Sequence, residues 1–481
     1  MKTKIDYFDY DTLLQPTDWR FAAAVVGLCK YFDYFGIDYK VLYDVEEKPD
    51  NYIHGFDGII YKSEDITEEK YLEFVENYFE KYMTHKNILN ILKSQEFSEE
   101  QIKLVNDLVK SKTVLKGLFD KIKFDGTNKD IFISTIEENR AEIIKNIFKN
   151  GNNLYKNYCN ERLIFTEDNS TCRLRGYNVD KDRKTSNLGF CFSKESFESN
   201  DILEFDFIPF AFSNSDMRET YFVNNNFSVK SLTQTNYAFS NQLSSTENKD
   251  DKNKLMLVLQ NSKDYISYDV EIISKSQDKA YYETFFVRLE RLKKLRELSG
   301  KSLNFVKKIN DDYWFNLEKE VYMRCMNNIL LDDVILKMFK FFYFEESEKK
   351  NSKAISEIRK TQKNIMYKIG LLVDINVSWK GNEIMDEIKS AKSCGFLTSK
   401  KLIEMKSSNK INSYKQKIIS ALCAHDYDRT KEIILSLSAY VGMEFSFFYT
   451  FLENAEENKD LAFAFASALS EVSSKNNEEN N

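Results

Sequence analysis

Three successive amides, Asn224, Asn225 and Asn226, lie between a strand-like stretch at 220–223 and a helix that Ser228 would cap. An asparagine side chain has both a hydrogen-bond donor and an acceptor, so amides at such a turn can read the edges of DNA bases. Asparagine is also common in ordinary turns, and that interpretation stays open. We predict that the three asparagines contact nucleic acid.

A second group of polar residues lies in the segment 151–200, which is loop-rich and basic. Arginine binds phosphate groups through its planar guanidinium, so this loop could contact a phosphate backbone. A solvated charged loop would have the same composition. The candidate phosphate contacts are Arg173, Arg175, Lys181, Arg183 and Lys184.

The same segment contains an incomplete zinc-knuckle pattern. Cys172 and Cys191 each begin a CxxC-like motif, but Arg175 and Lys194 occupy the second cysteine positions. Recruiting Cys159 gives only three thiolates, whereas a structural zinc site needs four ligands. We therefore expect no metal and no cofactor.

The sequence lacks the short motifs of the common enzyme classes. It has no GxxxxGK[ST] loop, GxGxxG turn, GxSxG elbow or HExxH helix, and its only histidines are His54, His85 and His425. Nucleotide-binding loops, serine-hydrolase elbows and zinc-protease sites depend on those motifs. We expect a protein that is not an enzyme and has no catalytic residues.

The net charge of −7 is unevenly distributed along the chain. Residues 349–431 contain 18 Lys and Arg against 8 Asp and Glu. Lysines spaced among apolar helical positions form a basic side of a bundle, which suits a phosphate backbone, although a solvated face is the usual explanation of such a run. The candidate contacts to a nucleic-acid backbone are Lys400, Lys401, Lys415 and Lys417.

The elements that must position these residues belong to a folded chain. Of its 481 residues, 42% are hydrophobic and 14% aromatic, too many for a disordered protein. No apolar run reaches the roughly 18 to 20 residues that a membrane span needs, and the first residues lack the apolar core of a signal peptide. We expect a cytoplasmic protein.

Apolar periodicity and turn residues predict the order of the elements. A buried helix is expected at 19–35, capped by Asp18 and ended by Gly36. Further helices are expected near 63–83, 86–124 and 129–150. Aromatic and β-branched content predicts strands at 52–62, 203–212, 220–223, 254–260 and 265–273.

From residue 281 the pattern is helical almost to the polar end of the chain. We therefore predict the class α+β, with a small sheet and several helices in an N-terminal domain over 1–280. An all-α bundle is expected over 281–471, followed by a disordered tail over 472–481.

Taken together, these features resemble one protein family, the large subunit of the type I CRISPR Cascade complex. The matching residues are Asp18-Trp19 with 23–27, the remnant Cys172–Gly176, and 220–230 with its three asparagines. They point to subtype I-B, in the branch with paired CxxC motifs, and the loss of both second cysteines departs from that pattern. The resemblance covers most of 15–245, and the last third fits in architecture only.

The resemblance implies a non-catalytic subunit of an RNA-guided surveillance complex in antiviral defence. Such a subunit recognises the protospacer-adjacent motif (PAM) in target double-stranded DNA, stabilises the R-loop and recruits a helicase-nuclease. With this resemblance we expect the PAM duplex to be contacted by Asn224, Asn225, Asn226 and Lys230, and the displaced strand by Lys400, Lys401, Lys415 and Lys417. The implied partners are the crRNA, the target DNA, the other Cascade backbone subunits and the helicase-nuclease, with no membrane. Internal starts at Met323, Met326 or Met338 could also produce a C-terminal fragment that serves as small subunit.

Two alternatives come from other functional classes. The first is a defence-associated nuclease or toxin, which metal-dependent cleavage by the purified chain would favour. The second is a cytosolic scaffold that binds only protein, which a failure to bind DNA at any salt concentration would favour.

Overall fold

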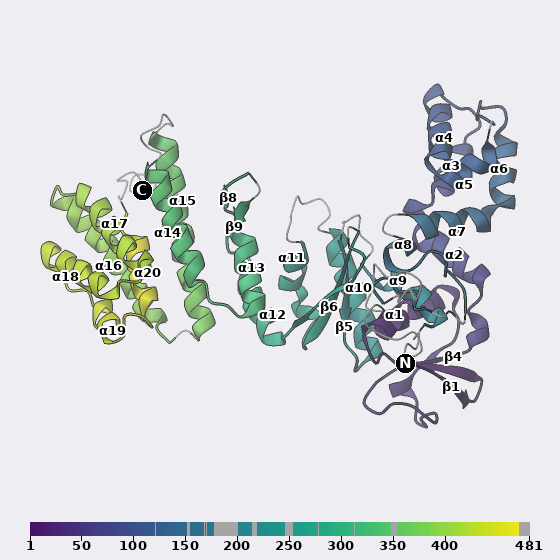
Figure 1. Cartoon of the computed structure of the whole chain (residues 1–481), viewed down its shortest axis with the longest axis horizontal. Coiled ribbons are helices and arrows are strands. Elements are labelled where there is room, and N and C mark those ends of the chain that lie inside the picture. Colours follow the sequence, from purple (N-terminus) through teal and green to yellow (C-terminus); the bar gives the residue numbers. More distant parts are fainter. Residues whose placement is uncertain are drawn as a thin grey trace, which may run out of the picture. The chain divides into compact units, whose positions relative to one another are not determined.

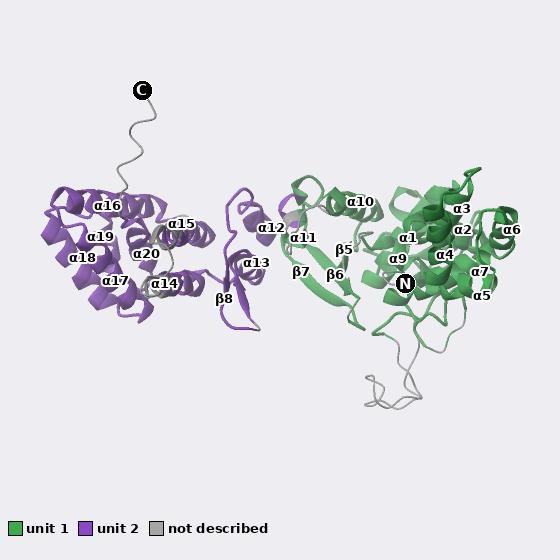
Figure 2. Cartoon of the chain, turned by 90° about the horizontal axis from the view of Figure 1, so that it is seen from above, with its two compact units in different colours: residues 1–258, 262–289 green, residues 259–261, 290–481 purple. Residues whose placement is uncertain are grey.

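The computed structural model contains two compact units, 1–258 with 262–289 and 259–261 with 290–481 (Figure 2). The predicted tail at 472–481 and residues 178–200 of the predicted loop lie outside the described residues. The structure describes residues 1–120, 122–151, 154–167, 169, 171–177, 201–213, 219–245, 254–277, 279–311, 313–347, 355–381 and 383–470.

The first unit combines two small antiparallel sheets with helices (Figure 1). One sheet has the strand order β1-β2-β4-β3 and the other the order β5-β6-β7. Its elements, up to the junction with the second unit, are β1 (Lys2–Tyr7), β2 (Tyr10–Leu14), α1 (Trp19–Phe35), β3 (Lys40–Val41), η1 (Leu42–Asp44), β4 (Ile59–Tyr61), η2 (Ser63–Asp65), α2 (Glu68–Tyr78), η3 (Glu80–Tyr82), α3 (Thr84–Leu92), α4 (Glu99–Ser111), α5 (Thr113–Phe119), α6 (Lys129–Glu138), α7 (Arg140–Asn150), α8 (Tyr155–Tyr158), η6 (Leu203–Phe207), α9 (Ile208–Ala211), β5 (Glu219–Asn224), α10 (Val229–Ser245), α11 (Lys254–Gln260), η7 (Ser262–Asp264), β6 (Val270–Ser276) and β7 (Glu283–Val287).

Helix α1 forms the centre of the first unit and has the predicted bounds. The Asp18 side chain accepts hydrogen bonds from the backbone N–H groups of Arg20 and Phe21, and Gly36 ends the helix in the left-handed region at φ 63°. The middle of the helix is buried on all sides and packs against η6 and α9. At Gly27 the approach is so close that a Cβ atom would lie 2.0 Å from the carbonyl oxygen of Phe207.

The second unit is mainly helical, with one short hairpin of β8 and β9. Helix α20 is buried along most of its length and packs against α15, α16, α17 and α19. The elements of this unit are α12 (Leu289–Arg296), β8 (Val306–Lys308), β9 (Trp314–Asn316), α13 (Leu317–Asn327), α14 (Asp332–Ser347), α15 (Ile355–Lys380), α16 (Met385–Glu404), α17 (Asn409–Cys423), α18 (Tyr427–Val441), α19 (Phe447–Glu453) and α20 (Lys459–Ala468). The α+β class is therefore confirmed.

Several predicted elements are wrong. Residues 203–211 and 254–260 are helical rather than extended, because the periodicity of a short apolar run does not distinguish a strand from a helix. The strand predicted at 52–62 is confined to β4, and the helical region predicted from 281 begins with β7 and later includes β8 and β9. No helix in the described ranges is long and apolar enough to cross a bilayer.

The close packing at Gly27 gives the first testable prediction. The substitution Gly27→Ala should destabilise the protein by about 1–3 kcal/mol or more, because the added methyl meets backbone atoms of Phe207 rather than a flexible side chain. Thermal unfolding of the full chain, followed by circular dichroism, measures the effect. The matched control is Gly117→Ala, because Gly117 is exposed on α5 and a Cβ atom there would have no neighbour within 4 Å. This substitution should be neutral or stabilising. Equal melting temperatures for both variants would contradict the packing described here.

Candidate nucleic-acid interface

The asparagine turn lies where β5 ends and α10 begins. Asn224 is the last residue of β5 and pairs in register with Glu271 of β6, and its Nδ2 donates to Glu271 Oε2 at 2.7 Å. Asn225 Oδ1 accepts from the Ser228 N–H at 3.2 Å, and its Nδ2 donates to the Tyr268 hydroxyl at 3.1 Å. Two of the three asparagines therefore hold the turn in shape through their side-chain hydrogen bonds.

Ser228 caps α10 as predicted. Its hydroxyl accepts a hydrogen bond from the Ser231 N–H at 3.2 Å, and the carboxylate of Asp57 accepts from the Val229 N–H at 2.7 Å. Lys230 is exposed in the first turn of α10, beside the asparagines in sequence. The first unit thus fixes the direction in which the chain leaves the turn.

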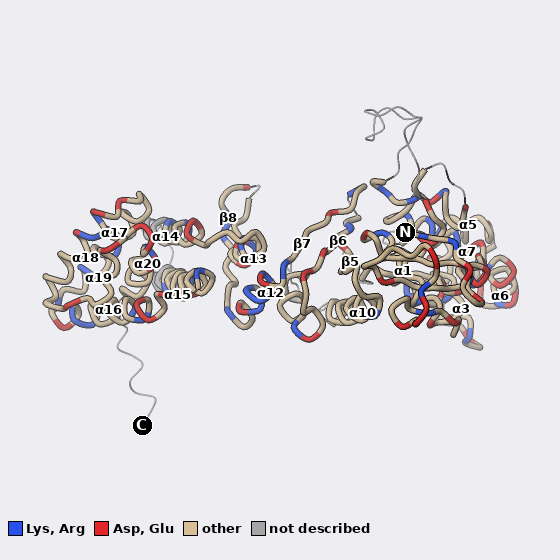
Figure 3. The backbone as a smooth tube through the Cα atoms, turned by 90° about the horizontal axis from the view of Figure 1, so that it is seen from below, with Lys and Arg blue, Asp and Glu red and all other residues tan. Residues whose placement is uncertain are grey.

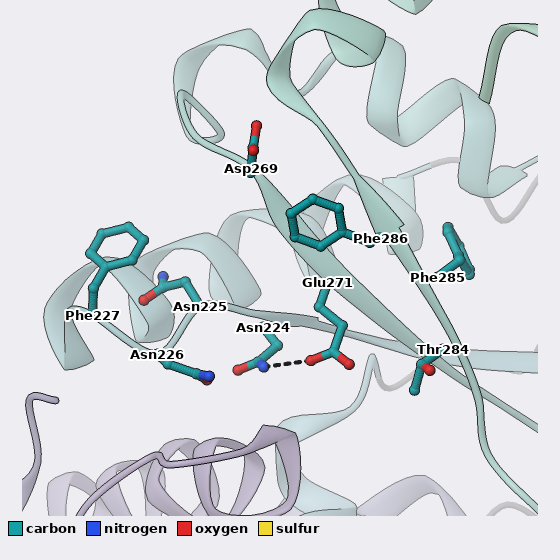
Figure 4. A pocket seen from close by; sticks show the side chains of 9 residues that line it. All are labelled: Asn224, Asn225, Asn226, Phe227, Asp269, Glu271, Thr284, Phe285 and Phe286. Atoms are coloured by element: carbon teal, nitrogen blue, oxygen red, sulfur yellow. Dashed lines mark hydrogen bonds between the residues drawn. The ribbon is translucent and has the colours of Figure 1, made fainter. Parts of the chain in front are cut away.

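The three asparagines line a pocket of about 470 Å³. Oδ1 of Asn224 and Oδ1 of Asn226 are both buried and have no hydrogen-bond partner among the described residues. Figure 4 shows the side chains of Asn224 and Asn226 close together, with Glu271 bonded to Asn224. The lining residues are Asn224, Asn225, Asn226, Phe227, Asp269, Glu271, Thr284, Phe285 and Phe286.

The chemistry of this pocket favours hydrogen-bond donors. Among the described residues, its lining combines Asn224 and Asn226, whose Oδ1 atoms are unpaired, with the acidic residues Asp269 and Glu271, and it includes no Lys or Arg. Phe286 is 62% exposed and Phe227 46% exposed, so aromatic faces are available beside the polar atoms. Such a pocket repels phosphate groups and suits a flat ring that carries an amino group.

The basic loop is only partly described, and one of its residues is interior. Arg173 is fully buried, with its guanidinium 2.9 Å from Asp201 Oδ2 and 2.8 Å from Asp206 Oδ1. Burial opposes the charge on Arg173, but the carboxylates of Asp206 and Asp201 outweigh it and raise the pKa of the guanidinium. Arg173 therefore offers no free face to a phosphate group, and we assign it a structural role.

The remaining predicted phosphate contacts differ in their surroundings. Arg175 is partly exposed and forms an ion pair with Glu161 at 3.1 Å. Lys181, Arg183 and Lys184 lie outside the described residues.

Two of the three cysteines considered for a zinc knuckle, Cys159 and Cys172, are interior residues. Cys159 and Cys172 are buried, and burial raises the pKa of both thiols, that of Cys172 to about 11. Cys191 lies outside the described residues. Within the described ranges, no three His, Cys, Asp or Glu side chains gather in a way that could hold a metal ion.

The four predicted lysines of the second unit are not equivalent. Lys400 and Lys401 are exposed near the end of α16, and Lys417 is exposed on α17. Lys415 is only 3% exposed, and its Nζ lies 5.2 Å from the centre of the Phe342 ring. The structure thus brings three of the four to the surface, where acidic and basic residues are interspersed along these helices (Figure 3).

Sequence reasoning missed the residues that complete the asparagine pocket. Glu271, Asp269 and Phe286 come from the strands and turns around β6 and β7, 43 or more residues after Asn226. The only available signal was the strand-like content of 265–273, which does not reveal the pairing register. The helix expected after 281 also concealed β7, which contributes Phe285 and Phe286.

Comparison with known proteins gives one family. The family described as CRISPR-associated protein Csx8 matches residues 10–257 and 241–469. The chain belongs to this family. No curated protein and no solved structure matches it.

Membership of the Csx8 family confirms the predicted association with CRISPR systems. It covers the asparagine pocket and the exposed lysines alike, because the two matched ranges extend over nearly the whole chain. The assignment to subtype I-B, the large-subunit role and the individual contacts are finer than the family description and are taken up below.

The buried position of Arg173 gives the second prediction. Arg173→Met should destabilise this Csx8-family protein by about 3–5 kcal/mol at pH 7, because Asp201 and Asp206 would be left buried without a counter-charge. Burial already raises the pKa of Asp206, and removing the cation raises it further. The loss should therefore shrink as the pH falls and the carboxylates become neutral.

Urea unfolding at pH 7 and at pH 5 measures this dependence. Arg175→Met is the matched control, because the ion pair with Glu161 is partly exposed and should change the unfolding free energy by no more than about 1 kcal/mol. An Arg173→Met protein with unchanged stability and weakened nucleic-acid binding would instead make Arg173 a phosphate contact.

Proposed function

We propose that this Csx8-family chain is the non-catalytic large subunit, of subtype I-B, in a Cascade-type RNA-guided surveillance complex. In this role it recognises the PAM in target double-stranded DNA, stabilises the R-loop and recruits the helicase-nuclease. The observation that carries the proposal is the asparagine pocket, with its two unpaired amide oxygens, on a CRISPR-associated chain.

The pocket suits a base edge better than a phosphate group. Amino groups occur on cytosine and adenine in the major groove and on guanine in the minor groove, and each can donate to Asn224 Oδ1 or Asn226 Oδ1. The carboxylates of Asp269 and Glu271 add to the preference for donors. Lys230, outside the pocket lining and exposed, is then available for the adjacent phosphate.

The second unit has the surface expected of a strand-holding module. Lys400, Lys401 and Lys417 are exposed, and a set of lysines binds a phosphate backbone without reading its sequence. Lys415 is left out of this contact, because its side chain is interior. In this proposal the three exposed lysines contact the displaced strand.

The proposed partners are the crRNA, the target DNA, the Cascade backbone subunits and the helicase-nuclease. A C-terminal fragment that starts at Met323 would lack β8 and β9. Phe315 of β9 is buried and its ring lies 5.1 Å from that of Phe341, so this fragment would expose part of the apolar core of the second unit. A separate small subunit made in this way must cover that surface.

The third prediction separates contact from folding at the asparagine turn. Asn226→Ala should weaken binding to duplexes that carry the correct flanking motif by about 5- to 150-fold, the equivalent of 1–3 kcal/mol for a lost base contact. Targets that are already single-stranded should bind as before. The substitution removes an unpaired oxygen and breaks no side-chain hydrogen bond in the described part of the chain, so the melting temperature should not change.

The assay uses complex purified through a tag on the full chain, with its bound RNA sequenced. Asn225→Ala is the control, because it removes the hydrogen bonds to Ser228 and Tyr268 and should lower the melting temperature. Equal loss of affinity for both kinds of target with Asn226→Ala would contradict base reading. Bound RNA without guide sequences would contradict the proposed function itself.

The fourth prediction concerns the exposed lysines. Replacing Lys400, Lys401 and Lys417 by Gln together should weaken the R-loop similarly on all targets. It should also reduce the slope of log affinity against log salt by about 2, at roughly 0.7 per phosphate contact for a single strand. Recognition of the flanking motif should survive.

Lys415→Met is the control for this experiment. It alters an interior side chain beside Phe342, so any effect should appear in stability rather than in salt dependence. If the triple variant melts normally and keeps the wild-type salt slope, the second unit holds its partner by other means, and its lysines do not contact the displaced strand.

A further inference from the structure

A second pocket, of about 100 Å³, lies in the first unit and is lined by cations. Lys156 and Asn157 come from α8, Lys275 from β6, Lys279 from the turn after β6, and Arg175 from the segment that follows Leu174. Gly151 and Gln277 complete the lining, and none of the lining residues in the described part of the chain is a carboxylate. The cations come from three separate parts of the sequence, and only the fold brings them together.

Lys275 is a buried cation that forms no ion pair within the described residues. It is 1% exposed, and its Nζ donates to neutral oxygens only: the backbone carbonyls of Ser276, at 2.8 Å, and Lys279, and Asn157 Oδ1 at 3.4 Å. Burial, assisted by repulsion from Arg175, lowers the pKa of Lys275 to about 8. An ammonium group in this position is mostly charged at neutral pH and is stabilised by any anion that enters the pocket.

Asn157 presents an unused donor to the same space. Its side chain is 8% exposed. Because its Oδ1 accepts from the Lys275 ammonium, the amide is oriented with Nδ2 on the opposite side. Nδ2 is buried and has no hydrogen-bond partner among the described residues. A buried donor is normally paired, so this one calls for an acceptor that the polypeptide does not supply.

The remaining charges leave the pocket positive. Arg175 Nη2 forms an ion pair with Glu161 Oε2 at 3.1 Å, and Lys279 Nζ forms one with Glu283 Oε2 at 2.5 Å. Both ion pairs are partly exposed. Lys156 is exposed and forms no hydrogen bond or ion pair in the described part of the chain. Among the described residues, Lys156 and Lys275 therefore provide two positive charges without an ion-pair partner, beside the amide of Asn157.

We propose that this pocket binds a phosphate group, with Lys156, Lys275 and Asn157 Nδ2 as the groups that hold it. Its small volume suits one compact oxyanion rather than a whole nucleotide, and its donors match the acceptor oxygens of phosphate. On a CRISPR-associated chain the source is a nucleic-acid backbone, and this part of the inference rests on the proposed function. The pocket has the opposite chemistry to the asparagine pocket, where carboxylates exclude phosphate.

The experiment measures binding of inorganic phosphate, and of a short single-stranded oligonucleotide, to the full chain. Phosphate binding is followed by ³¹P NMR titration and oligonucleotide binding by fluorescence anisotropy, at matched ionic strength. Lys156→Gln and Lys275→Met should each weaken binding of both probes about tenfold or more, as expected for a lost charge-assisted hydrogen bond. Lys103→Gln is the matched control, because Lys103 is an exposed lysine on α4, and it should bind both probes like the unaltered chain.

Each outcome bears on the inference. Unchanged affinity for both probes in Lys156→Gln, which alters an exposed side chain and so keeps the fold, overturns the site. Loss of phosphate binding with no change in oligonucleotide binding keeps the pocket but overturns its nucleic-acid source in favour of a free anion. The test is independent of the asparagine pocket, since Asn226→Ala should leave phosphate binding unchanged.

Discussion

The buried ion pairs of Arg173 with Asp201 and Asp206 are the constraint on which the rest of the first unit depends. Asp206 also accepts hydrogen bonds from the Tyr155 hydroxyl and the Phe165 N–H, so one carboxylate joins η6 to α8 and to the loop before Arg173. A buried pair of this kind adds little net stability by itself, but it is costly to break because the surviving charge has no water around it. It therefore acts mainly by allowing only one arrangement of these segments.

The asparagine pocket and the cationic pocket both depend on that arrangement of segments. Asp206 immediately precedes Phe207, whose backbone lies against Gly27 of α1, and Tyr155 immediately precedes Lys156 and Asn157. The cationic pocket therefore includes residues that directly follow a partner of the ion pair. The asparagine pocket lies in the second sheet of the same unit, where Phe222 and Ile273 pack in the core cluster that contains α1.

Local features of the fold could be read from the sequence, whereas pairing could not. Asp18 and Gly36 cap the two ends of α1, and Ser228 caps the start of α10. Capping depends on residue type and nearby backbone, so these helix boundaries were predictable. Asn224 was recognised as a candidate because its residue type and its position after a strand are also local features of the sequence. Its partner Glu271 depends on the register of β5 and β6, and the burial of Arg173 and Lys415 depends on tertiary neighbours, which spacing along the chain does not encode.

Strand β6 connects the two pockets and explains why their chemistry can differ so sharply over a short distance. Glu271 and Lys275 are four residues apart on it, so their side chains leave the same face, about 13 Å apart at roughly 3.3 Å per residue. Each is matched to its surroundings: Glu271 to a donor from Asn224, and Lys275 to neutral oxygens only. An extended nucleic acid alternates bases that carry amino donors with phosphates that carry negative charge. Strand β6 has an acceptor-rich pocket near Glu271 and a cationic pocket near Lys275. This arrangement is complementary to the alternation of bases and phosphates.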